Sequence, residues 1–94
     1  MAHIFIKHKV ADYGAWKEVF DGFVETRRAG GEKSFQILHP DNDPNNLYLM
    51  FEWDNLANAQ NFINSPELKS TMEKAGVSEE PQISFLNELD KGIL

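Results

Sequence analysis

Four short segments of the chain are rich in β-forming residues or alternate between apolar and polar positions, and both patterns predict β-strands. These segments are residues 3–10, 32–39, 47–53 and 82–89. Proline, aspartate and asparagine dominate residues 40–46, between the second segment and the third, and such a run is typical of a hairpin connection. The chain therefore contains one predicted hairpin and two intervals long enough for a helix.

Apolar residues spaced three or four positions apart predict an amphipathic helix in each of those two intervals. Asp12 is a suitable cap for the first helix, and the paired glycines at positions 30 and 31 end it. Its apolar stripe is Tyr13, Trp16, Phe20, Phe23 and Val24. The second helix is interrupted at Ser65 and Pro66, where a capping serine and a first-turn proline together restart a helix.

The order strand, helix, strand, strand, helix, strand is that of the ferredoxin-like fold, an α+β architecture. In this fold two helices cover one face of a four-stranded antiparallel sheet. We expect a single domain of this kind over residues 1–94, with the first and third strands at the centre of the sheet. Within it we expect these two central strands to run in the same direction.

The sheet face that the helices leave uncovered carries large apolar residues among polar ones. They are Phe5, Leu38, Tyr48, Met50 and Leu86. Exposed together they would form a patch of roughly several hundred Å², which is unusual for a stable monomer. We therefore expect a homodimer that pairs these two faces across a two-fold axis and closes into a dimeric α/β barrel.

The composition argues against several functional classes. The formal net charge is −6 and no basic cluster is longer than Arg27 and Arg28, so we expect no nucleic-acid binding. The absence of cysteine excludes disulfides, thiolate catalysis and cysteine-ligated metals. No apolar run approaches the roughly 20 residues of a membrane helix, and no secretory signal is visible. We expect a cytoplasmic protein without membrane contact.

Several local motifs resemble the antibiotic-biosynthesis-monooxygenase-like group, over roughly residues 3–89. These motifs are Leu49–Leu56, Phe62–Leu68, Ala75–Val77 and Val10–Tyr13, with Trp16 and Phe20 following the last of them. The resemblance implies a dimeric α+β barrel. The group includes cofactor-free quinone-forming oxygenases, haem-degrading enzymes and many small proteins of unassigned role. The asparagine–tryptophan–histidine set of the haem-degrading members has no counterpart that we can place here, so the resemblance implies no haem.

Aromatic residues and one histidine are the candidates for a ligand site. With the first and third strands running in the same direction, His8 and Trp53 would meet at one edge of the sheet, close to Tyr13 on the first helix. Apolar pockets with few polar groups are typical of small-molecule sites, and we predict one lined by Tyr13, Trp16, Phe20, Trp53 and Phe62. His8 is the candidate catalytic residue, as a base that accepts a proton from a phenol or enol. The alternative is a partly exposed histidine beside ordinary core aromatics.

The histidines and acidic residues do not predict a metal site. We expect His39 to lie at the opposite end of the sheet from His8, nearer to His3, and no carboxylate completes a ligand set. Asp41, Asp43, Asn45 and Glu52 match spaced positions of a calcium-binding loop. The alternating strand at 47–53 would carry the last of them away from the turn, so we interpret these residues as a solvated hairpin. No glycine-rich phosphate loop is present either, and we expect no cofactor.

Three functional hypotheses remain open from the sequence. The first is a homodimeric barrel that binds a small apolar or aromatic molecule between its sheet and helices. The second is an enzyme in the same cavity, a cofactor-independent monooxygenase or cyclase-like catalyst acting on a phenolic substrate. The third is a structural or interaction module, in which side chains would fill the space between Trp16, Trp53 and Phe62.

Overall fold

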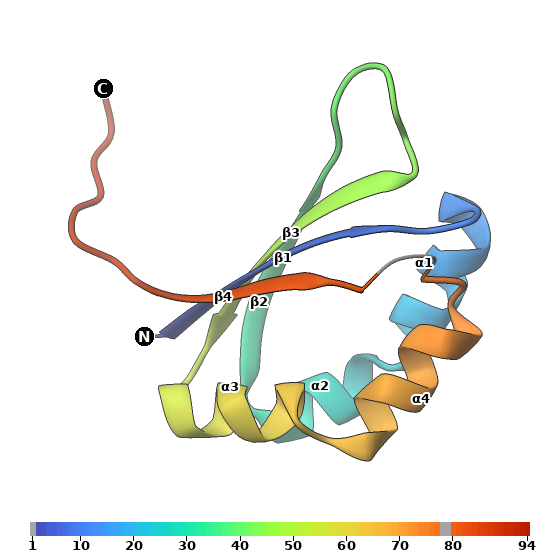
Figure 1. Ribbon diagram of the computed structural model, residues 1–94. Helices are drawn as coiled ribbons and strands as arrows, with labels where there is room; N and C mark the ends of the chain where they lie inside the picture. The colour runs from blue at the N-terminus through green and yellow to red at the C-terminus, as the bar shows by residue number, and fades with distance from the viewer. Residues whose placement is uncertain (1, 78–79) are drawn as a thin grey trace.

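The computed structural model describes residues 2–77 and 80–94, which form a four-stranded sheet with helices on one of its faces (Figure 1). The elements in chain order are β1 (Ala2–Lys9), α1 (Tyr13–Gly22), α2 (Val24–Gly30), β2 (Glu32–Leu38), β3 (Asn46–Trp53), α3 (Leu56–Ile63), α4 (Pro66–Lys74) and β4 (Gln82–Asn87). The strand order across the sheet is β2-β3-β1-β4. This is the ferredoxin-like α+β fold that the sequence predicted.

Every pair of neighbouring strands is antiparallel, including the central pair β1 and β3. The expectation that these two strands run in the same direction is wrong. The chain runs along β1, returns through α1 and α2, and then runs along β2 in the direction of β1. The hairpin after β2 reverses it once more, so β3 is opposed to β1 (Figure 1).

Side-chain oxygens cap the helices where the sequence suggested. The Asp12 carboxylate accepts a hydrogen bond from the Ala15 amide at 2.9 Å, and the Ser65 hydroxyl oxygen accepts one from the Leu68 amide at 3.3 Å. Pro66 occupies the first turn of α4, so the predicted restart of the second helix is confirmed.

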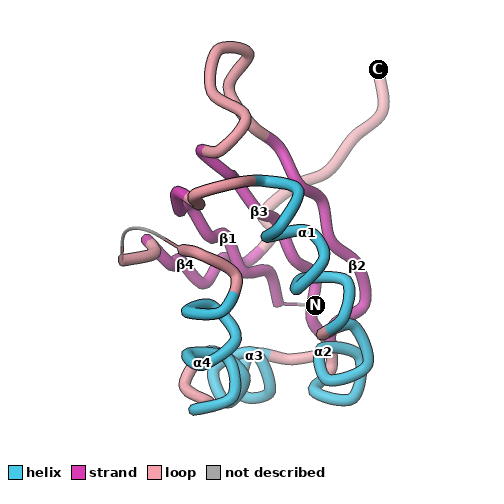
Figure 2. The backbone as a smooth tube through the Cα atoms, turned by 90° about the vertical axis from the view of Figure 1, so that its right-hand side faces the viewer, coloured by secondary structure: helices cyan, strands magenta, loops and turns pink. Residues whose placement is uncertain are grey.

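The first helical segment, expected as one helix, is broken at Phe23 into α1 and α2. Phe23 has φ −97° and ψ 7°, outside the helical region, and its amide is shared between the carbonyls of Val19 and Phe20. Gly22 lies directly before the break, and glycine is a poor helix former because it gains backbone freedom when the helix unwinds. Figure 2 shows that the two pieces remain on the same side of the sheet as α3 and α4.

The core lies between the helices and the inner face of the sheet. Along β1 and β3 the inner positions are buried in strict alternation, as in Ile4, Leu47 and Leu49. Phe35 and Phe85 also belong to this face by register, but they lie on the two edge strands and remain partly exposed. The centre of the sheet is therefore better covered than its edges.

The outer face of the sheet carries no helix among the described residues (Figure 1). Phe5 and Tyr48 make an edge-to-face contact there, with ring centroids 6.1 Å apart, and the Lys7 ammonium lies 5.3 Å from the Tyr48 ring centroid. Leu38 and Leu86 are 47% and 42% exposed. The register of the strands thus gathers the predicted apolar residues on one open face.

Candidate functional site

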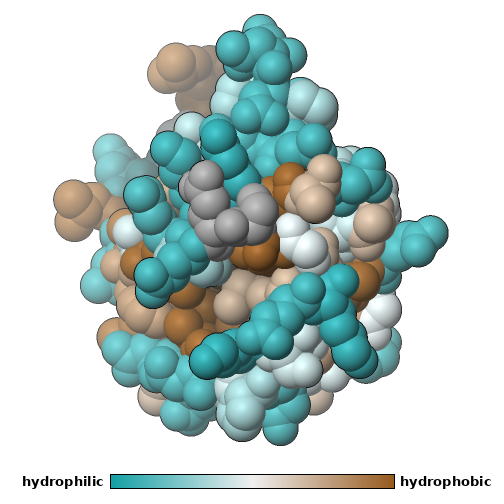
Figure 3. All heavy atoms as spheres, turned by 45° about the vertical axis from the view of Figure 1, so that its right-hand side comes forward, coloured by the Kyte–Doolittle hydropathy of each residue, from teal (hydrophilic) through white to brown (hydrophobic). Residues whose placement is uncertain are grey.

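A small cavity of about 60 Å³ lies between the sheet and the helices. Its walls come from β1, from all four helices and from the break at Phe23, and its lining side chains are predominantly apolar. The lining residues are Ile6, His8, Trp16, Val19, Phe20, Phe23, Arg27, Phe62, Leu68, Thr71, Met72 and Ala75. Figure 3 shows apolar atoms gathered near the middle of one face, framed by hydrophilic side chains.

His8 is the most unusual group in this wall. It occupies an inner-face position of β1 opposite Leu47, and only 6% of its surface is exposed. Its ring meets Trp16 edge-on, with centroids 5.7 Å apart. Neither ring nitrogen has a hydrogen-bond partner in the part of the chain that the structure describes. Burial lowers the pKa of His8 to about 4, because the apolar surroundings disfavour the charged imidazolium. The imidazole is therefore neutral near pH 7, with one nitrogen as donor and the other as acceptor.

Four of the six predicted site residues line the cavity: His8, Trp16, Phe20 and Phe62. Tyr13 does not, although its ring stacks on Trp16 with centroids 5.9 Å apart. Trp16 and Phe20 stack in turn at 4.8 Å, so the aromatic wall continues along α1. Tyr13 thus packs against the core with the rest of the apolar stripe on α1 without lining this cavity.

Trp53 does not meet His8, contrary to expectation. In the antiparallel register His8 lies opposite Leu47 and Trp53 lies opposite Ala2, which separates the two by roughly 20 Å at about 3.3 Å per residue. Trp53 is fully buried, and its ring lies 4.8 Å from that of Phe62. A Cβ atom built on Gly30 would come within 3.2 Å of the indole, so α2 approaches this ring through bare backbone.

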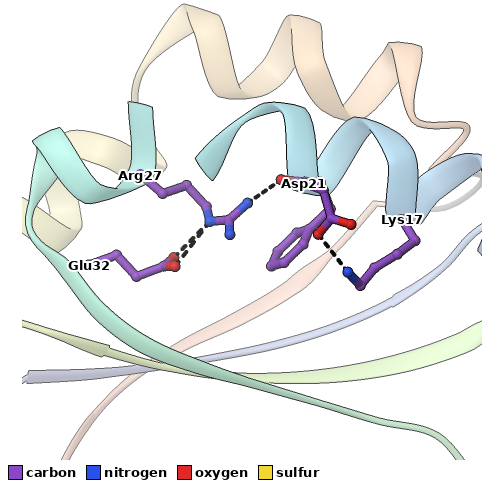
Figure 4. A network of polar contacts seen from close by, with 5 residues as sticks. Lys17, Asp21, Arg27 and Glu32 are labelled. Atoms are coloured by element: carbon purple, nitrogen blue, oxygen red, sulfur yellow. Dashed lines mark hydrogen bonds and ion pairs between the residues drawn. The ribbon is translucent and has the colours of Figure 1, made fainter. Parts of the chain in front are cut away.

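A buried ion pair that the sequence analysis did not single out also reaches the cavity (Figure 4). Arg27 is 3% exposed, and its Nε donates to both carboxylate oxygens of Glu32 at 3.1 and 3.0 Å. Its Nη1 donates to the carbonyl of Phe20, and its guanidinium carbon lies 3.6 Å from the Phe20 ring centroid. A signal was present in the sequence, because Arg27 continues the three-and-four spacing of Trp16, Phe20 and Phe23 and so belongs to the apolar stripe.

Burial and Arg27 act in opposite directions on Glu32. Desolvation raises the pKa of Glu32 above its usual value, whereas the charge and the hydrogen bonds of Arg27 lower it. The raising effect of burial is the larger of the two. Arg27 thus compensates only part of the cost of holding this carboxylate away from water.

A second, polar pocket of about 290 Å³ also has His8 in its lining. It is lined by Lys7, His8, Lys9, Asn46, Glu80 and Gln82. Among residues 2–77 and 80–94, His8 is the one that lines both this pocket and the apolar cavity. His8 therefore adjoins both an apolar cavity and a polar pocket.

No group of three or more histidine and acidic side chains is arranged to hold a metal ion among residues 2–77 and 80–94. The expectation that His39 lies at the opposite end of the sheet from His8, nearer to His3, is wrong. His39 follows β2 at the hairpin end of the sheet, where His8 also lies, whereas His3 is opposite Glu52 at the other end.

In the hairpin, the Asn45 side chain accepts a hydrogen bond from the Tyr13 amide at 2.9 Å. Asn45 therefore ties the hairpin to the start of α1.

The fold and the apolar cavity define a ferredoxin-like α+β protein with its candidate site between sheet and helices. The sequence matches the antibiotic biosynthesis monooxygenase family over residues 1–74, and the chain belongs to that family. No curated protein matches the sequence. The described helices include none with the length and apolar character needed to cross a membrane.

Solved structures share the fold at low sequence identity. SnoaB, described as a cofactor-independent oxygenase from Streptomyces nogalater, superposes with a TM-score of 0.77 at 10% identity, over 96% of this chain and 94% of that one. Rv0793 from Mycobacterium tuberculosis gives a TM-score of 0.71 at 13% identity, with 98% of each chain covered. A conserved protein from Methanosarcina mazei Go1 gives 0.72 at 14% identity, over 93% of this chain and 91% of that one.

Proposed function

We propose that this protein is a homodimeric α+β barrel that binds a small apolar or aromatic molecule between its sheet and helices. The observation that carries the proposal is His8, a buried polar side chain with two unpartnered nitrogens, among the described residues, in the wall of an apolar cavity. A buried polar group without a partner costs free energy that a hydrogen-bonding ligand recovers. Membership of the antibiotic biosynthesis monooxygenase family supports a small-molecule role.

The size of the cavity limits the ligand. Its volume of about 60 Å³ is smaller than the engineered cavity of about 150 Å³ that takes up benzene in another protein. One aromatic ring therefore enters only after a lining side chain moves. Met72 is the best candidate, because methionine has three rotatable bonds and adapts readily to irregular space.

The outer face supports the dimer. Phe5, Leu38, Tyr48, Met50 and Leu86 share this face and no described helix covers them. Pairing two such faces removes the patch from water and shields the sheet on both sides.

The test is a titration with 4-ethylphenol, followed through carbon-13-labelled methionine methyl groups. Met72 lines the cavity and Met50 lies on the outer face, so binding in the cavity shifts the Met72 resonance and leaves Met50 unchanged. Met72→Ala should tighten binding by enlarging the cavity, which calorimetry measures because this variant lacks the reporter methyl group. A Met72 resonance that stays fixed at millimolar ligand would refute the binding role and favour an interaction module.

The second candidate is a cofactor-independent monooxygenase acting on a phenol, favoured by His8, which lines both pockets. The neutral imidazole would take the phenolic proton, leaving the electron pair on the phenolate oxygen, and would later return that proton to the departing water. Dioxygen would then place one oxygen atom on the ring, and the other would depart as water to give a quinone. SnoaB, which shares this fold, is described as a cofactor-independent oxygenase.

His8→Ala tests this second candidate. Loss of a general base should lower turnover of a phenolic substrate by about 100-fold or more. His39→Ala is the matched control, because His39 lies outside both pockets. An unchanged rate in His8→Ala would eliminate the base while leaving the binding proposal intact.

A further inference from the structure

Resting on the proposed ligand site, we propose that Arg27 contacts the ligand and selects a single-ring aromatic compound with a carbonyl oxygen at one end and a hydroxyl group at the other. Arg27 would donate to the carbonyl oxygen, and His8 would accept from the hydroxyl. Glu32 would act as a positioning residue that fixes the guanidinium.

The hydrogen-bond inventory of Arg27 leaves donors for such a ligand. An arginine side chain carries five N–H donors in a fixed plane. The Nε donor is used by Glu32 and one Nη1 donor is used by the Phe20 carbonyl. The remaining donors have no partner in the part of the chain that the structure describes, although Arg27 is buried and lines the cavity. A ligand oxygen in the cavity would give one of these donors an acceptor.

The Thr71 hydroxyl does not compete for this role. It lines the same cavity, but it donates to the Glu67 carbonyl at 2.7 Å within α4. Among the described residues that line the cavity, both nitrogens of His8 are buried without a partner, and Arg27 keeps donors beyond those given to Glu32 and Phe20.

The charge balance decides between a carbonyl group and a carboxylate. Glu32 already neutralises the guanidinium at a distance of 3.0 Å. A carboxylate ligand would add an uncompensated negative charge beside Glu32 in apolar surroundings, which is costly. A carbonyl group offers its oxygen lone pairs without a net charge, so it fits the Arg27–Glu32 pair better.

The positions of the two polar groups set the shape of the ligand. Three successive contacts lead from His8 to Trp16, from Trp16 to Phe20 and from Phe20 to Arg27, at 5.7, 4.8 and 3.6 Å. His8 and Arg27 thus lie at the two ends of an aromatic wall. A flat ring against this wall reaches both only if its oxygens project from opposite ends.

The experiment compares three probes that differ at one end: 4-hydroxyacetophenone, 4-ethylphenol and 4-hydroxybenzoate. We expect 4-hydroxyacetophenone to bind about tenfold more tightly than 4-ethylphenol, the scale of one hydrogen bond to a charged group. We expect 4-hydroxybenzoate to bind no better than 4-ethylphenol. The Met72 methyl resonance reports all three affinities.

Two variants assign the preference to Arg27. Arg27→Lys keeps the positive charge but loses the planar fork, and Arg27→Met combined with Glu32→Leu replaces the ion pair by apolar residues. In both variants, 4-hydroxyacetophenone should bind about as tightly as 4-ethylphenol, and 4-ethylphenol should still bind. Arg28→Met, next in the sequence and exposed, should retain the preference.

The outcomes separate this inference from the proposed function. If 4-ethylphenol binds and the ketone shows no advantage in the wild-type protein, Arg27 has no selective role and the binding proposal stands. The same holds if the advantage survives in Arg27→Lys. If none of the probes shifts Met72, the ligand site and the inference fail together.

Discussion

The imidazole of His8 meets the indole of Trp16 edge-on, with an interplanar angle of 77° and no hydrogen-bond partner for either imidazole nitrogen among the described residues. The contact joins β1 to α1 at the cavity wall. It also places a titratable ring where water cannot solvate its charged form. The acid stability of the fold and the chemistry of the candidate site therefore depend on the same side chain.

Acid should destabilise the fold through His8. Its pKa is about 4 in the folded protein and about 6.5 when unfolded, so between these values the unfolded state binds more protons. Stability should therefore fall as the pH falls below about 6.5, with a total loss of about 3 kcal/mol by pH 4. Urea unfolding at several pH values between 7.5 and 4 measures how the free energy of unfolding changes with pH. This pH dependence should be weaker in His8→Phe and unchanged in His39→Gln. If it is unchanged in His8→Phe, other groups cause the acid destabilisation.

Breaking the Arg27–Glu32 pair from one side should cost more than removing both charges. Arg27→Met leaves the buried Glu32 carboxylate unpaired, which should cost about 3–5 kcal/mol of unfolding free energy. Adding Glu32→Leu should restore most of that loss. Arg28→Met removes an exposed pair with Glu25 and should change stability by less than about 0.5 kcal/mol. Chemical denaturation compares the variants, and a double variant as unstable as the single one would contradict this account.

Association should depend on the outer face of the sheet. We expect the wild-type protein to sediment as a dimer at micromolar concentration. Met50→Glu places a charge next to Phe5 in the middle of this face and should give a monomer. Asn61→Glu, on the exposed side of α3, is the control and should leave the dimer intact. A wild-type monomer in sedimentation velocity would overturn the proposed barrel.

Two glycines should respond to alanine in opposite ways. Gly31 has φ 124°, and a Cβ there would collide with the Asp54 carboxylate, so Gly31→Ala should cost at least about 1 kcal/mol. Gly22 ends α1, and a methyl group added there would meet no described atom within 4 Å, so Gly22→Ala should stabilise by up to about 1 kcal/mol. Thermal unfolding of the two variants measures whether each substitution stabilises or destabilises the fold. A stabilised Gly31→Ala would show that Asp54 is free to move aside.

The sequence predicted the strands and their faces well, because a period of two residues assigns each side chain to one face without knowledge of the partner strand. Ile4 and Phe5 lie on the inner and outer faces as expected. The direction of β3 was wrong because alternation contains no information about direction. That error alone brought His8 and Trp53 together in the expected site.

Arg27 shows a different limit. A charged residue at the end of a helix is usually solvated, so the charge of Arg27 hides its place on the apolar stripe. Only the folded chain reveals that Glu32, five residues later, turns back to meet it. Pairing across a helix-to-strand connection depends on tertiary geometry, which local patterns do not encode.

Gly30 allows α2 to pack closely against the indole of Trp53. One hydrogen atom, rather than a methyl group, lies between α2 and the indole of Trp53. An alanine there would require the indole or the helix end to move by a few tenths of an ångström, three positions after Arg27. The close packing of α2 on Trp53, and with it the position of Arg27 in the cavity wall, therefore depends on glycine at position 30.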